Sequence, residues 1–160
     1  MLDFCTFPLV KIQRHIPRIV FNLLLISLLS LSSASQKEIY QVKVYIKNIR
    51  NSKGRIQLQV YKNQESFKKE IPWKSTTVSK SQIKNNALTY TFKGLPKGIY
   101  GVALLDDENC NTKMDYGWLL PNEGFGFSDY YHSGWSKPNF NDFKFYLDKN
   151  KSVTMDVRYL

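Results

Sequence analysis

The sequence predicts an all-β protein: an antiparallel β-sandwich of about seven strands, immunoglobulin-like or transthyretin-like, with an eight-stranded barrel as the alternative. Two observations carry this prediction. From residue 36 onward, apolar residues recur with period two, which is the periodicity of strands that bury one face. Turn residues separate these segments at short intervals, and the chain contains neither a run of helices nor an internal repeat.

The individual elements follow from the same periodicity. Strands are expected at 42–46, 56–60, 77–79, 88–92, 99–105, 143–147 and 153–159. Short turns separate the first two and the last two of these strands, so each pair is expected to form a hairpin. The strand at 99–105 is almost wholly apolar and is predicted to be central, after a tight turn at 94–98. One helical turn is expected at 65–69, and the segment 106–141 shows no strand alternation.

The alternation also predicts which side chains are buried. The expected core residues are Val42, Val44, Ile46, Ile56, Leu58, Val60, Leu88, Tyr90, Phe92, Val102, Leu104, Phe143, Phe145, Val153, Met155 and Val157.

Residues 1–35 are predicted to be a signal peptide. Lys11, Arg14 and Arg18 precede an apolar run at 19–31, which is too short to span a bilayer and is followed by small residues up to Ser35. We therefore expect secretion or export to the periplasm, leaving residues 36–160 as one domain. An uncleaved N-terminal anchor is the alternative.

The composition bounds the classes of function. The chain has 23 basic and 13 acidic side chains and a net charge of +10, but export removes nucleic acid as a partner. A solvated lysine surface, or attraction to anionic glycans or lipids, accounts for the charge. After residue 35 there is one histidine, His132, one cysteine, Cys110, and no Gly-x-Ser-x-Gly motif, so the sequence predicts no enzyme.

An acidic loop carries oxygen side chains at the spacing of a calcium loop. Its candidate ligands are Asp107, Asn109, Asn111, the carbonyl of Lys113, and Asp115. Position six is Thr112, where calcium loops have glycine, and position twelve is Trp118, where an EF-hand has glutamate. The alternative is an Asx-rich turn whose side chains bind their own backbone, with no cofactor.

Aromatic residues are concentrated in a polar segment from Trp118 to Phe140. Such side chains either stack on a ligand or pin a long loop to the domain. The candidates for ligand binding are Trp118, Tyr130, Tyr131 and Trp135, whereas Phe125 and Phe127 are expected to pin the loop.

Three motifs occur in a characteristic order. Gly94-Leu95-Pro96-x-Gly98-x-Tyr100 is followed by Asp107-Glu108-Asn109-x-Asn111-x-Lys113-x-Asp115 and then by Pro121-x-Glu123-Gly124-Phe125-Gly126-Phe127-Ser128. In this order the chain resembles the exported bacterial domain-of-unknown-function family 2141, over essentially all of residues 36–160. The resemblance implies a short secreted β-sandwich and no established reaction. Where that family typically has glycine between and after the two asparagines, this sequence has Cys110 and Thr112.

Together these observations predict an exported, non-catalytic binding module for a glycan or another envelope component. The alternative is a structural or assembly protein of the cell envelope that offers an edge strand to a partner. Exposed aromatic side chains near Trp135 would favour ligand binding, and a long unprotected edge would favour assembly.

Overall fold

The computed structural model describes residues 37–118 and 120–160. The predicted signal peptide, residues 1–35, lies outside the described residues. Within the described ranges, no helix is long and apolar enough to cross a membrane.

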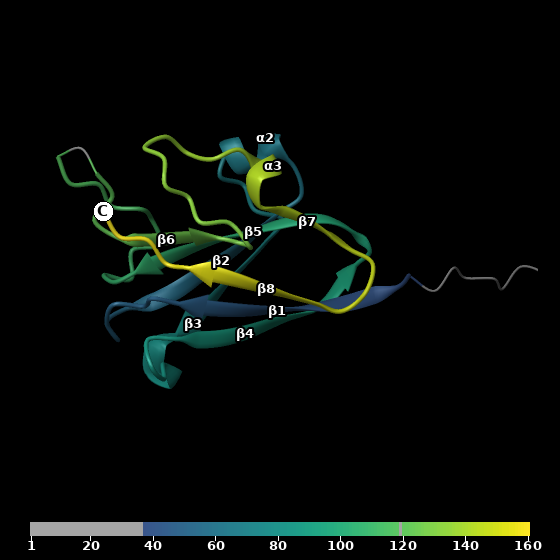
Figure 1. The fold of residues 1–160 in the computed structure, drawn as a ribbon, viewed down its shortest axis with the longest axis horizontal. Coiled ribbons are helices and arrows are strands. Elements are labelled where there is room, and N and C mark those ends of the chain that lie inside the picture. Colours follow the sequence, from purple (N-terminus) through teal and green to yellow (C-terminus); the bar gives the residue numbers. More distant parts are fainter. Residues whose placement is uncertain (1–36, 119) are drawn as a thin grey trace, which may run out of the picture. The chain divides into compact units, whose positions relative to one another are not determined.

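Two β-sheets form the domain (Figure 1). The three-stranded sheet has the order β4 (Leu88–Pro96), β1 (Ile39–Lys47) and β8 (Lys151–Asp156). The five-stranded sheet has the order β3 (Lys74–Ser79), β2 (Arg55–Tyr61), β5 (Gly98–Asp107) and β6 (Gly124–Phe127), with β7 (Lys144–Leu147) also paired to β5. The described residues also form three short helices: α2 (Gln64–Lys68), the 3₁₀ helix η1 (Lys80–Gln82) and α3 (Phe140–Phe143). The predicted all-β sandwich is confirmed, with eight strands.

Both predicted hairpins are wrong. β1 pairs with β4 and with β8, and β2 pairs with β3 and β5, so the first two strands belong to different sheets. Likewise β7 pairs with β5, whereas β8 crosses to the other sheet and pairs with β1, in parallel. Alternation along a strand fixes which face is buried but not which neighbour it binds, and this is why the pairing could not be predicted.

The connection at 48–54 carries the chain from one sheet to the other. Asn48 and Gly54 adopt positive φ angles of 61° and 68°, and Ile49 turns into the core. A Cβ atom on Gly54 would overlap the carbonyl oxygen of Asp107, so only glycine allows this close approach.

The core between the sheets agrees closely with the predicted residues. Every predicted core residue is buried except Tyr90, which is half-buried and packs against the cluster. Phe143 is buried as predicted, but it belongs to a second cluster. That cluster consists of Tyr61, Phe67, Ala103, Phe127, Phe140 and Phe143, and α2 and α3 contribute to it. Since side chains cover both faces of β5, this strand is apolar along nearly its whole length.

Three local predictions have mixed outcomes. The helical turn is confirmed as α2, where the Asn63 side chain caps the N-terminus by accepting from the backbone N–H of Ser66. The turn predicted at 94–98 is confined to Lys97, because β4 continues to Pro96, β5 begins at Gly98, and Gly94, with φ 72°, lies inside β4. The segment 106–141 contains a strand, β6, which the alternation missed because glycine fills two of its four positions.

Candidate functional site

The acidic loop leaves the end of β5 and folds around the buried carboxylate of Asp107. One oxygen, Oδ1, accepts the backbone N–H of Asn111 at 3.0 Å. The other, Oδ2, accepts the backbone N–H of Thr112 and the Nε–H of Arg55, both at 3.0 Å. Arg55 also donates to the carbonyl of Cys110, so one carboxylate and one guanidinium hold the first half of the loop.

Four of the predicted metal ligands lie together, and their side chains form hydrogen bonds within the loop. Asn109 Oδ1 accepts the N–H of Asn111, and Asn111 Oδ1 accepts the N–H of Lys113, at 3.0 and 2.8 Å. The side-chain amides of both asparagines donate to Asp115. These bonds are those of the Asx-rich turn. Among the described residues, no group of three or more His, Cys, Asp or Glu side chains could hold a metal ion.

Cys110 and Thr112 have the backbone conformation that favours glycine. Their φ angles are 65° and 68°. Glycine, which the family resemblance implies at both positions, adopts such angles without steric cost. Cys110 is an exposed free thiol.

Charged side chains support the base of the loop. Arg50 Nε donates to Glu108 Oε1 at 2.6 Å and lowers the pKa of that carboxyl below its ordinary value. Glu123 is buried, and burial raises its pKa. It accepts the backbone N–H of Glu108 at 3.0 Å and so ties the two ends of the loop together.

The aromatic residues divide into an exposed group and a packed group. Trp118, Trp135 and Tyr131 are 95%, 82% and 58% exposed, as a ligand-binding role requires. Tyr130 is half-buried against the second cluster, so the structure separates it from the other three candidates. Tyr116 is 68% exposed and joins the exposed group, although the sequence analysis did not single it out.

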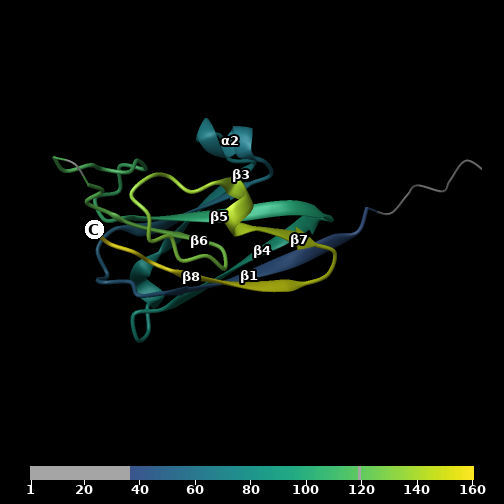
Figure 2. The same cartoon turned by 45° about the horizontal axis from the view of Figure 1, so that its top comes forward.

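The loops that carry these exposed side chains lie next to each other. The ribbon views show the segments 108–118 and 128–139 side by side near the C-terminus (Figures 1 and 2). Arg158 holds the second loop by donating to the carbonyls of His132 and Gly134 at 2.7 and 2.8 Å. The ring of His132 lies among Phe125, Phe127 and Tyr130, and its Nε2 contacts the Ser136 carbonyl at 2.6 Å. These contacts place His132 as a loop-packing residue.

A buried ion pair lies between the sheets, and the sequence did not predict it. Lys80 of η1 is 2% exposed, and its Nζ contacts Oδ1 of the fully buried Asp106. The hydroxyl of Tyr159 donates to Oδ2 at 2.6 Å. Burial raises the pKa of Asp106, against the opposing effect of Lys80. No local pattern marks one lysine among many as buried, so only the fold could reveal this pair.

The comparisons with known proteins identify the family. No curated protein and no solved structure matches the chain. A family described as "Uncharacterized protein conserved in bacteria (DUF2141)" matches residues 44–155, which include the acidic loop, the aromatic segment and both sheets. The chain belongs to this bacterial family, DUF2141.

Proposed function

We propose that the protein is an exported, non-catalytic binding module whose loop aromatics contact a glycan or another component of the cell envelope. The observation that carries this proposal is the exposure of Trp118, Tyr131 and Trp135 on neighbouring loops. A rigid aromatic ring presents a flat apolar face and loses little side-chain entropy on binding. Exposed apolar side chains mark an interaction site where they gather into one patch.

Two sets of contacts support the view that both loops are ordered before a ligand binds. The acidic loop is closed by hydrogen bonds within itself and to Arg55. The second loop is held by Arg158 and by the rings around His132. Preorganised loops lower the entropy lost on binding.

Assembly through an edge strand is the other candidate. β3 is an edge of the five-stranded sheet with six residues, and β4 is an edge of the three-stranded sheet with nine. The exposed positions of both are polar residues or glycine, and β4 carries Lys93 and a register shift in its pairing with β1. Polar, lysine-bearing or bulged edges are weak templates for strand addition, so the exposed aromatics support ligand binding over assembly.

The test is a glycan array together with pull-down on purified envelope polysaccharides, using the protein as cells export it. We expect binding that Tyr131→Ala combined with Trp135→Ala abolishes while the circular-dichroism spectrum is unchanged. The matched control is Tyr146→Ala, because Tyr146 is an exposed aromatic on β7, outside both loops. Binding that survives the double substitution would move the site elsewhere.

Export is tested on the same preparation. Mass spectrometry should find a mature N-terminus at Ser35 or Gln36. An intact Met1 in the exported fraction would contradict cleavage.

A further inference from the structure

The outer face of the three-stranded sheet presents lysine and hydroxyl side chains in ordered rows. In the register of β4, β1 and β8, Lys43 lies between Thr91 and Ser152. Two residues further along β1, Tyr45 lies between Thr89 and Thr154. Side chains two residues apart on a strand share one face and are about 7 Å apart, so the two rows form one continuous surface.

A shallow groove runs across this face. It has a volume of about 330 Å³, and its lining residues are Gln41, Lys43, Thr91, Asn150, Lys151 and Ser152. Lys43 presents its side chain on this face, whereas Lys151 pairs with the buried Val42 and its ammonium lies 5.9 Å from the ring centroid of Phe145, on the inner side of the sheet. The lining contains no carboxylate, and its remaining side chains are amides and hydroxyls. The groove therefore offers hydrogen bonds and positive charge.

Further lysines lie on the same face. Lys47 and Lys93 also lie at exposed positions of β1 and β4. Among the outward positions of the three strands, the acidic residue is Asp156, which lies opposite Lys47 in the register and away from the groove. Tyr45 is 37% exposed, and its ring holds the ammonium of Lys43 at 4.9 Å from the ring centroid, which restricts that side chain before a ligand binds.

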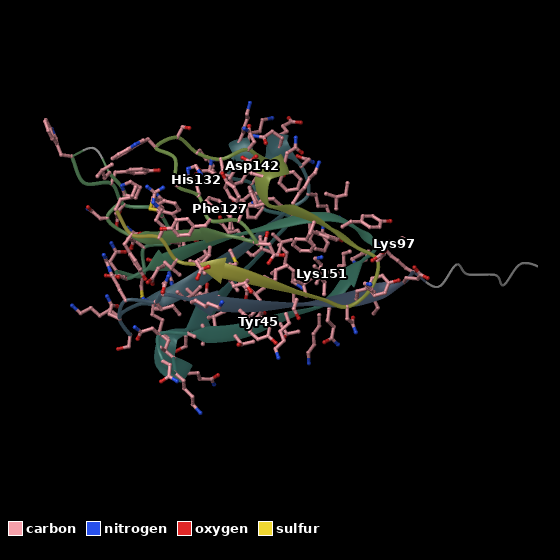
Figure 3. All side chains as sticks on the ribbon, in the orientation of Figure 1. Tyr45, Lys97, Phe127, His132, Asp142 and Lys151 are labelled. Carbon is pink, nitrogen blue, oxygen red and sulfur yellow. The ribbon has the colours of Figure 1, made fainter. Side chains whose placement is uncertain are left out.

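We propose that this groove binds an acidic polysaccharide, a chain of sugars bearing carboxylates or sulfates. Lys43 and Lys93, which lies two residues from Thr91 on β4, would meet the anionic groups, and the threonine and serine hydroxyls would exchange hydrogen bonds with sugar hydroxyls. A row of hydroxyl side chains suits a polyhydroxylated ligand, whereas binding to a lipid surface gains from apolar side chains that enter the bilayer. The surface is separate from the loop aromatics: in Figure 3, Tyr45 lies along β1, far from His132 and Phe127.

The test measures binding of the exported protein to polygalacturonate, with neutral dextran and phosphatidylglycerol vesicles as the other probes. We expect binding to polygalacturonate that weakens as salt is added, and little binding to dextran. Lys43→Gln combined with Lys93→Gln should weaken binding about five- to tenfold. The matched control is Lys53→Gln combined with Lys84→Gln, which removes the same charge from exposed lysines outside the sheet face and should leave affinity unchanged.

Several results would overturn the proposal. One is no binding to polygalacturonate; another is equal weakening in both double variants, which would reflect net charge alone. Binding to vesicles without binding to the polymer would assign the face to a membrane instead. If Tyr131→Ala with Trp135→Ala abolishes binding while the lysine variant retains it, the loop proposal stands and the groove proposal fails. If the lysine variant loses binding while the aromatic variant retains it, the groove proposal stands and the loop proposal fails.

Discussion

Removing the charge of Lys80 should destabilise the protein strongly, although nothing in the sequence around it suggests so. The side chains of Lys80 and Asp106 are 1% and 0% exposed, and Asp106 keeps only the Tyr159 hydroxyl once the ammonium is gone. Breaking a buried ion pair at one partner costs about 3–5 kcal/mol, because the remaining charge stays in a medium that solvates it poorly. We therefore expect Lys80→Met to lower the free energy of unfolding at neutral pH by about that amount.

The loss of stability caused by Lys80→Met should be smaller at acid pH than at neutral pH. Burial raises the pKa of Asp106, and loss of the lysine raises it further. A carboxyl whose folded-state pKa exceeds its unfolded-state pKa contributes stability below the unfolded-state value, and that contribution is lost as the pH rises through the folded-state value. The difference between Lys80→Met and the wild type should therefore narrow as the solution is acidified from neutral pH.

Urea denaturation followed by tryptophan fluorescence measures both effects. The matched control is Lys84→Met, an exposed lysine four residues away, which should change stability by less than about 0.5 kcal/mol. Lys80→Met combined with Asp106→Leu should cost much less than Lys80→Met alone, because no uncompensated charge remains. If Lys80→Met behaves like Lys84→Met, the lysine is not buried against Asp106 and the reasoning fails.

Three further predictions concern the acidic loop. Thr112→Gly should raise the free energy of unfolding by up to about 1 kcal/mol in urea denaturation, because it removes the strain of φ 68°, whereas Thr112→Ala, which keeps that strain, should not. Arg50 lowers the pKa of Glu108, so the contribution of Glu108 to stability is present above the unfolded-state pKa and is lost as the pH falls through the folded-state pKa. Glu108→Gln should therefore reduce the fall in the free energy of unfolding at acid pH. An unchanged fall would contradict this. Melting temperatures in millimolar calcium and in chelator should be equal, because the loop oxygens already accept internal N–H groups; a calcium-dependent rise that Asp115→Asn removes would instead establish the metal site.

The sequence determined the fold class and almost the whole core between the sheets. The alternation of residues such as Val42, Val44 and Leu58 reports directly on which side of a strand faces water, since side chains on a strand alternate between its faces. The motifs around the acidic loop and the aromatic segment also located the candidate site and the family.

Only the tertiary structure decided which strands pair and which side chains meet. A strand with one buried face can bind any neighbour that offers a similar face, so β1 and β8 pair in parallel although the chain between them spans most of the domain. The same holds for Lys80 and Asp106, and for the rows of Lys43 and Tyr45 with hydroxyls from β4 and β8. These contacts join residues far apart in sequence, and local periodicity carries no information about them because it reflects only burial along one strand.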